Sequence, residues 1–219
     1  MRKPIAKEVA VTEGSEVEPI GVAVCRLCLD PVRGRLRHPL QAGIAIRAGM
    51  FAELTLAGRV IGRTWPQAVG ESRTGNPLPD AVHRAVANRR PTQWRRWFSH
   101  VHADRQAAID YLVKSGRWQL DGKRIVDPQA AETVLEQTEI VRAINASEAP
   151  EDLHTMMVRL LVVAVGGGGG RPAPVKSWRL AKVWLPQRLP EGADHATYFA
   201  TRAGLRAIRR AATFRVFSR

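Results

Sequence analysis

Arginine side chains are gathered into clusters in this sequence, and several of them stand beside tryptophan or histidine. The guanidinium group binds phosphate and carboxylate through paired hydrogen bonds, and it also stacks on aromatic rings. These residue types therefore indicate a protein that binds an anion rather than one that catalyses a reaction. The clusters comprise Arg33, Arg35 and Arg37; Arg89, Arg90, Arg95 and Arg96 around Trp94 and Trp97; His100, His102 and Arg105; and Arg202, Arg206, Arg209 and Arg210.

One arginine has a different setting, because Arg47 lies within the apolar stretch AIRAGMFAELTLAGRVIG (residues 45–62). A helix that is apolar on nearly every side is normally buried, and a buried charge is costly without a partner. Two arrangements would satisfy Arg47. It can project into the mouth of a pocket where a bound phosphate supplies the opposite charge, or it can form an internal ion pair with Glu53 or another carboxylate.

Signatures of catalysis and of metal binding are missing from the sequence. There is no nucleophile elbow, no pair of catalytic carboxylates and no phosphate-binding loop, since the glycine run at residues 166–170 lacks the required lysine. His100 and His102 lack a carboxylate-rich partner, and the single pair Cys25 and Cys28 is expected to be buried and structural. We therefore expect no enzyme, no metal, no cofactor and no small-molecule substrate.

The net charge of the 219-residue chain is +14, from 34 lysines and arginines against 20 acidic residues. Such an excess indicates an acidic partner, either nucleic acid or an anionic membrane surface. Two cysteines are typical of a reducing cytoplasm, and residues 1–20 lack the apolar core of a signal peptide. The most apolar segment is short and contains Arg159, so no transmembrane helix is expected.

The hydrophobic pattern predicts a mainly α fold with one or two small hairpins. We expect a strand or hairpin over 22–39, a short strand over 59–65, and a hairpin over 117–126 with Asp121-Gly122 as a type I′ turn. Helices are expected over about 41–57, 81–90 with Asp80 as cap, 91–116 in two pieces, 128–146, 150–165, 178–189 broken at Pro186, and 195–214. The predicted organisation is a flexible tail (1–20), a helical core (21–165), a Gly/Pro linker (166–176) and basic C-terminal helices completing the same domain (177–219).

Three motifs, in order, resemble the Golgi phosphoprotein 3 family in its bacterial branch. The first is of the type R-G-x-x-x-E-L-x-L-x-G-R, here Arg47 to Arg59 with Ala48-Gly49 in the place of the glycine. The second is T-G-x-x-L-x-D at residues 74–80, and the third is L-V-x-x-G at residues 112–116. The similarity covers about residues 22–165. It implies a helical bundle with a short hairpin, and peripheral membrane proteins rather than enzymes. Eukaryotic members bind phosphatidylinositol 4-phosphate in a shallow basic pocket and act as trafficking adaptors.

The resemblance also implies which residues form that pocket. Arg47 matches the arginine of the family's first core helix, and Arg105 matches the second of a pair of arginines. His102 stands where the first of that pair is expected, and His38 where the family has a tryptophan. Because histidine gains a proton in mild acid, such a pocket is expected to hold phosphate more strongly there. Arg35, Arg37, Arg95 and Arg96 are expected to add attraction to an anionic surface.

We therefore predict a cytoplasmic protein that associates peripherally with the inner face of a membrane and binds anionic lipid headgroups, with an adaptor role implied by the family. The alternative is a basic protein that binds nucleic acid through the Trp94–Trp97 region and the C-terminal arginine helix. The family uses a hairpin for self-association at the position of residues 117–126, but the oligomeric state stays open.

Overall fold

The computed structural model describes residues 18–71, 74–99, 101–169, 171–189 and 196–214. Residues 1–17, which make up most of the predicted tail, lie outside the described residues, as does His100. The fold is mainly α, as predicted. The helices are α1 (Ile20–Leu27), α2 (Pro39–Leu56), α3 (Pro77–Ala87), α4 (His102–Lys114), α5 (Ala130–Ala146), α6 (Leu153–Val165), α7 (Pro174–Arg188) and α8 (Ala196–Phe214), with the 3-10 helices η1 (Trp94–Phe98) and η2 (Gly167–Gly169).

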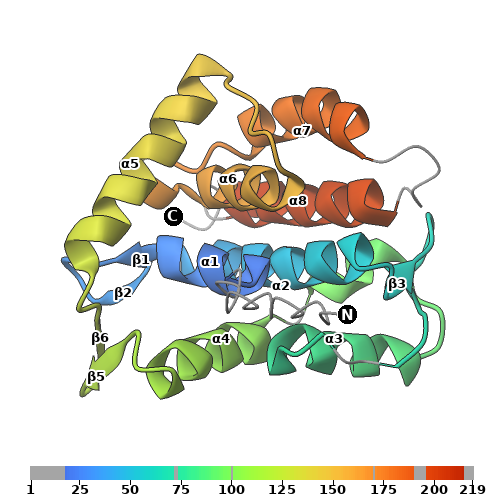
Figure 1. The fold of residues 1–219 in the computed structure, drawn as a ribbon, viewed down its shortest axis with the longest axis horizontal. Helices are drawn as coiled ribbons and strands as arrows, with labels where there is room; N and C mark the ends of the chain where they lie inside the picture. Colours follow the sequence, from blue (N-terminus) through green and yellow to red (C-terminus); the bar gives the residue numbers. More distant parts are fainter. Residues whose placement is uncertain (1–17, 72–73, 100, 170, 190–195, 215–219) are drawn as a thin grey trace, which may run out of the picture.

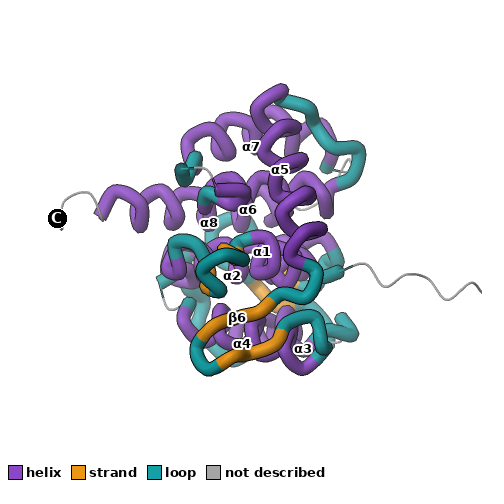
Figure 2. Tube along the Cα trace, turned by 90° about the vertical axis from the view of Figure 1, so that its left-hand side faces the viewer, coloured by secondary structure: helices purple, strands orange, loops and turns teal. Residues whose placement is uncertain are grey.

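Three short antiparallel hairpins complete the described structure. Strand β1 (Leu29–Asp30) pairs with β2 (Arg35–Leu36), β3 (Val60–Ile61) with β4 (Gln67–Ala68), and β5 (Gln119–Asp121) with β6 (Arg124–Val126). Helices α1 and α2 run through the middle of the molecule, with α3 and α4 on one side and α6, α7 and α8 on the other (Figure 1). The view turned by 90° shows the same three layers, with β6 beside α4 (Figure 2).

Helix α2 is apolar on nearly every side because other helices surround it. It packs against α1, α3, α4, α6 and α8. Small residues permit the closest approaches: Gly49 of α2 lies directly against the backbone of Gly21 in α1, and Gly204 of α8 lies against Ala48. The prediction of a buried helix over about 41–57 is confirmed, and its burial on all sides means that any charge on it needs a partner inside the protein or at its edge.

The segment predicted as a strand over residues 22–30 is wrong in its first part, because residues 20–27 form helix α1. The β-branched residues there favour a strand, but packing against α2 decides the outcome. The following residues do form a hairpin, β1–β2. Cys25 and Cys28 are buried and free, as expected for structural cysteines, although they lie on a helix and the turn after it rather than on a strand. Burial raises the pKa of Cys28 to about 12, which keeps the group a thiol.

Two helix boundaries also differ from the prediction. Asn76, not Asp80, caps α3, since its side chain accepts a hydrogen bond from the Leu78 amide at 2.9 Å. Asp80 instead accepts hydrogen bonds from the amide and hydroxyl of Thr74, both at 2.9 Å. Pro186 does not break α7, which continues to Arg188. It lies in the last turn, where loss of one amide donor disturbs little of the helix.

The turn of the β5–β6 hairpin lies one residue later than predicted. Asp121 pairs with Arg124, so Gly122 and Lys123 occupy the two central positions. Of these two, only Gly122 has a positive φ, of 58°. A type I′ turn needs positive φ at both positions, so that part of the prediction is wrong. The shift places the Lys123 side chain at the tip of the hairpin.

The glycine run after α6 is packed against neighbouring elements over residues 167–169. Gly167 lies against Val162 and the Leu27 carbonyl, and Gly168 against Val141 of α5. The last three residues of the predicted linker, 174–176, belong to α7. Helices α7 and α8 then return to α6 and α2, so the described C-terminal helices cover the same core as the helices before the glycine run.

Glu53 is a half-buried acidic residue on α2 that faces the start of α1. Its carboxyl group accepts a hydrogen bond from the Ile20 amide, while its Oε2 atom is buried without a hydrogen-bond partner in the described structure. Burial raises the pKa of Glu53 from 4.5 to about 7, and the nearby charge of Asp80 adds to the rise. Folding therefore favours the protonated form of this side chain.

We expect this shift to make stability depend on pH. The unfolded chain releases the Glu53 proton near pH 4.5, whereas the folded chain holds it up to about pH 7, so stability falls as the pH rises between these values. The variant Glu53→Gln has no proton to lose at this position. Its free energy of unfolding, relative to that of the wild type, should therefore rise by about 2 kcal/mol as the pH increases through this range. Urea unfolding of both proteins at about pH 5 and about pH 7.5 measures this change. If the variant and the wild type differ in free energy of unfolding by the same amount at both pH values, the raised pKa of Glu53 is contradicted.

Candidate functional site

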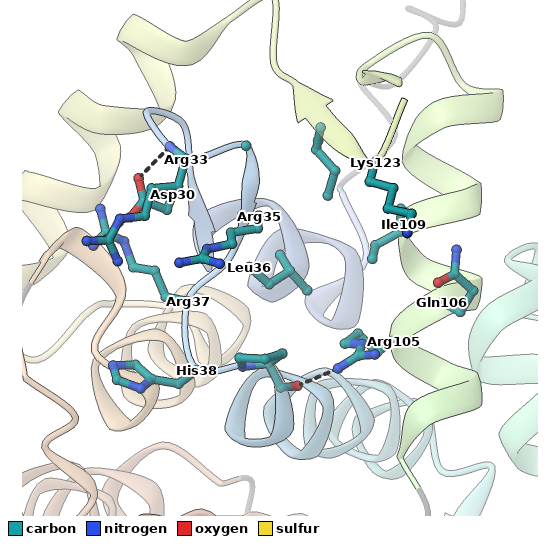
Figure 3. Close-up of a pocket in the computed structure, with 13 residues that line it drawn as sticks. Asp30, Arg33, Arg35, Leu36, Arg37, His38, Arg105, Gln106, Ile109 and Lys123 are labelled. Carbon is teal, nitrogen blue, oxygen red and sulfur yellow. Dashed lines mark hydrogen bonds and ion pairs between the residues drawn. The ribbon is translucent and has the colours of Figure 1, made fainter. Parts of the chain in front are cut away.

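A hollow with strongly basic walls opens beside the first turn of α2. Its volume is about 700 Å³, and we call it the basic hollow (Figure 3). The β1–β2 hairpin and the start of α2 form one wall, α4 forms the opposite wall, and the β5–β6 hairpin closes one end. The lining residues are Asp30, Arg33, Gly34, Arg35, Leu36, Arg37, His38, Pro39, Arg105, Gln106, Ile109, Lys123 and Ile125.

The two hairpins that frame the basic hollow are joined at Gly34. This residue has a φ of 60° in the β1–β2 turn, and its carbonyl accepts a hydrogen bond from the Ile125 amide at 2.8 Å. A side chain at position 34 would collide with Arg124, which donates a second hydrogen bond to the Val32 carbonyl at 2.9 Å. Glycine is required here by both the backbone conformation and the close approach. The contact fixes Lys123 relative to Arg35 of β2.

The first turns of α2 and α4 are also tied together. His38 precedes α2 in a left-handed conformation, with a φ of 44°, and Pro39 begins the helix. Arg105 of α4 donates a hydrogen bond to the Pro39 carbonyl at 3.4 Å, and its other terminal nitrogen lies 3.0 Å from Nδ1 of His102. His38 and Arg105 therefore both line the basic hollow, while His102 lies next to Arg105 on the exposed start of α4.

Positive charge in the basic hollow exceeds the negative charge that faces it. Asp30 is the one acidic residue among its lining residues, and its carboxylate lies 3.5 Å from Arg37 and 4.0 Å from Arg33. Arg35, Arg105 and Lys123 add three more cationic groups around the same space (Figure 3). The Nε atom of Arg37 is buried and has no hydrogen-bond partner in the described structure. An anion with several oxygen atoms would complement this arrangement.

Arg47 does not line the basic hollow. Its guanidinium group forms an ion pair and hydrogen bond with Asp104 of α4, and it donates a second hydrogen bond to the Trp97 carbonyl at 2.6 Å. The side chains of Arg47 and Asp104 are only 14% and 15% exposed. The internal ion pair considered from the sequence is therefore present, with Asp104 rather than Glu53 as the partner. The Asp104 carboxylate supplies the opposite charge for Arg47, which is the second of the two arrangements that the sequence allows.

The predicted auxiliary arginines divide between two places. Arg35 and Arg37 line the basic hollow, whereas Arg95 and Arg96 are exposed on η1, away from it. Sequence reasoning did not place Lys123 at the site, although its position beside the Asp-Gly turn was a signal that the residue would lie at a hairpin tip. It named Arg33 only as a member of a basic cluster and did not name Gln106; the packing of the hairpins and α4 brings both to the hollow.

The tryptophans of η1 are buried. Trp94 and Trp97 are 5% and 4% exposed, and both pack edge-on against Phe51 of α2, with ring centroids 5.1 and 5.7 Å apart. Their indole nitrogens donate hydrogen bonds to the carbonyls of Gly62 and Thr92. Stacking of nucleic acid bases on these rings, as the alternative prediction required, is contradicted by their burial.

The structure defines a class of protein: a helical domain with a buried central helix and a basic hollow framed by two hairpins. In the part of the chain that the structure describes, no helix combines the length and the apolar character needed to span a bilayer. Residues 23–208 match the Golgi phosphoprotein 3 (GPP34) family, and the chain belongs to this family. The match extends past the glycine run to α7 and most of α8. A comparison with curated proteins gives no match.

Proposed function

We propose that this protein binds anionic lipid headgroups of the phosphatidylinositol 4-phosphate type at the surface of a membrane, and that it is a binding protein rather than an enzyme. The observation that carries the proposal is the basic hollow, where five cationic side chains face one carboxylate. Guanidinium groups bind phosphate oxygens in pairs, and Lys123 adds a point charge. Membership of the Golgi phosphoprotein 3 family supports a role in lipid interaction.

Within this proposal, His38 and Arg105 contact the headgroup, and Arg47 acts as a positioning residue. The ion pair between Arg47 and Asp104 joins α2 to the first turn of α4, one residue before Arg105. Holding that turn in place directs the Arg105 guanidinium toward Pro39 and the basic hollow. The protein would be cytoplasmic and would associate peripherally with the inner face of a membrane, where a lipid of this kind presents its phosphate to the exposed β2 arginine, Arg35.

Charge reversal in the basic hollow tests the proposal. We expect the double variant Arg35→Glu/Lys123→Glu to bind anionic vesicles at least about thirtyfold more weakly than the wild type, since each cationic side chain near the membrane contributes about 1 kcal/mol and the two new carboxylates add repulsion. The measurement is co-sedimentation with vesicles whose negative charge is matched between phosphatidylglycerol, phosphatidylinositol and phosphatidylinositol 4-phosphate. A preference for the 4-phosphate at equal charge, lost in the variant, is the expected result.

A matched control separates the hollow from the overall charge of the protein. Arg84 on α3 and Arg179 on α7 are exposed, and they line neither the basic hollow nor the hollow between η1 and α8. The variant Arg84→Glu/Arg179→Glu changes the net charge by the same amount as Arg35→Glu/Lys123→Glu. We expect it to retain most of the binding. Equal losses in both double variants would show a general basic surface, and no binding of the wild type to any vesicle would overturn the proposal.

Nucleic acid binding is weaker as a second candidate, because the η1 tryptophans that it needs are buried. The observation that still favours it is the row of exposed arginines on α8, Arg206, Arg209 and Arg210. Competition between anionic vesicles and duplex DNA at fixed salt distinguishes the two candidates, since salt dependence alone is shared by both. Displacement of bound vesicles by DNA at equal phosphate concentration would favour the nucleic acid.

A further inference from the structure

A second hollow lies on the other side of the first turn of α2, between η1 and α8. Its volume is about 710 Å³, and its walls combine apolar and arginine side chains. Leu40 of α2 and the partly buried Phe199 of α8 supply apolar surface within it, whereas Ile44 and Phe98 also line it but are only 4% exposed. Leu40, which is 41% exposed, stands at its edge, next to the Pro39 that lines the basic hollow. The two hollows therefore flank the same turn of α2. We call this second one the α8 groove.

Two parallel rows of residues run along α8 beside the α8 groove. Ala203, Ala207 and Ala211 lie four residues apart and leave room above the helix surface, and each is only partly buried. The neighbouring row consists of Arg202, Arg206 and Arg210, also four residues apart. Side chains at this spacing fall on one side of a helix. The groove thus offers a narrow apolar trough with guanidinium groups along its length.

The arginines of the α8 groove have no acidic neighbour among its lining residues in the described structure. Arg63 and Arg95 add to the three from α8, and the guanidinium group of Arg63 lies over the Phe199 ring at 5.7 Å. Burial and the repulsion of Arg202, Arg209 and Arg210 lower the pKa of Arg206. The Nε atom of Arg202 is buried and has no hydrogen-bond partner there. An anion placed in the groove would relieve this repulsion.

We propose that the α8 groove is a second lipid site, which takes a phosphate-bearing membrane lipid with its phosphate on Arg206 and Arg210 and part of one acyl chain along the alanine row. The basic hollow differs from it, because Leu36, Ile109 and Ile125 are its only large apolar lining residues and charged groups dominate its walls. A free phosphate ion would use the arginines of the groove but leave Phe199 and the alanine row uncovered. An uncharged chain would leave the repulsion among these arginines without a neutralising charge, since their partner outside the groove, the Trp178 ring over which Arg202 and Arg206 lie at 5.1 and 5.5 Å, is itself uncharged.

A soluble amphiphile tests this site without a membrane. Decyl phosphate, kept below its critical micelle concentration, is titrated into the full-length protein in a calorimeter, with inorganic phosphate and decyl maltoside in separate titrations. We expect decyl phosphate to bind at least about tenfold more tightly than either of the others, because it alone offers both a phosphate and a chain. Equal affinity for inorganic phosphate would reduce the groove to an anion site and overturn the proposal.

Variants place the binding in the α8 groove. Ala207→Trp fills the trough without changing any charge and should abolish the advantage of decyl phosphate over inorganic phosphate. Ala211→Trp, nearer the end of α8, gives the same test if the first variant folds poorly by circular dichroism. Retention of the advantage in a folded variant would overturn the assignment. The variant Arg35→Glu/Lys123→Glu should keep the advantage, so failure of the basic hollow and failure of the groove remain distinguishable.

Discussion

Replacing Arg47 with methionine is expected to lower the free energy of unfolding by about 3 kcal/mol, since it leaves the Asp104 carboxylate nearly buried without its partner. The Trp97 carbonyl also loses a hydrogen bond. Methionine keeps most of the volume and the apolar contacts of the arginine stem, so the loss reports the charge and its hydrogen bonds. Urea unfolding monitored by tryptophan fluorescence gives the value directly. A loss below about 1 kcal/mol would show that the pair contributes little.

The double variant Arg47→Met/Asp104→Leu separates the stabilising role of Arg47 from a role in lipid binding. Removing both charges should restore about 2 kcal/mol, because an apolar pair of similar volume is often as stable as a buried ion pair. If Arg47 only positions α4, this restored protein should bind vesicles containing phosphatidylinositol 4-phosphate nearly as well as the wild type. Loss of binding by the stable double variant would place Arg47 among the residues that contact the lipid, as the family resemblance implied.

The variant Gly49→Ala should destabilise the protein by at least about 3 kcal/mol, although alanine favours a helix more than glycine does. A Cβ atom at position 49 would lie 2.9 Å from both the Cα and the amide nitrogen of Gly21. Backbone atoms cannot move aside as side chains can, so α1 and α2 would have to separate along their contact. Chemical unfolding measures the effect, and soluble yield shows whether the variant folds at all.

Gly21→Ala is the matched comparison for this contact. A Cβ atom there would meet chiefly the flexible side chain of Met50, at 2.8 Å, and the Ile46 carbonyl at 3.1 Å. We expect a smaller loss than for Gly49→Ala, since Met50 can change its rotamer. If Gly49→Ala is as stable as the wild type, or if Gly21→Ala is the more damaging of the two, the close approach described for these helices is incorrect.

Much of the fold follows from local signals in the sequence. The apolar pattern over about 41–57 predicts α2, and the apolar run up to residue 165 predicts α6, which begins at Leu153 rather than at residue 150 and is capped by Asp152 through a hydrogen bond from the Thr155 amide. The signals fail where packing overrides propensity. The β-branched residues of α1 favour a strand, and only the presence of α2 beneath Gly21 makes the helix the better solution.

The candidate site was predictable only in part, because long-range contacts assemble it. Arg105 and His38 were placed by family resemblance, and both line the basic hollow. The partner of Arg47 was not predictable, since Asp104 lies 57 residues away along the chain. Lys123 reaches the hollow only because Gly34 joins two hairpins that are distant in sequence. Charge clusters in a sequence show which residues could bind an anion, whereas the contact between the hairpins decides which of these residues line the same hollow.

The contact between α2 and α8 has a consequence for the order of synthesis. Helix α8 packs more extensively on α2 than any other described helix does, yet the ribosome makes it after all the other described helices. The apolar side of α2 that α8 covers must therefore stay open while the intervening helices are translated, and an exposed surface of this kind promotes aggregation. We expect a nascent chain that ends before Ala196 to need chaperone protection, and the core to close only once α8 has left the ribosome.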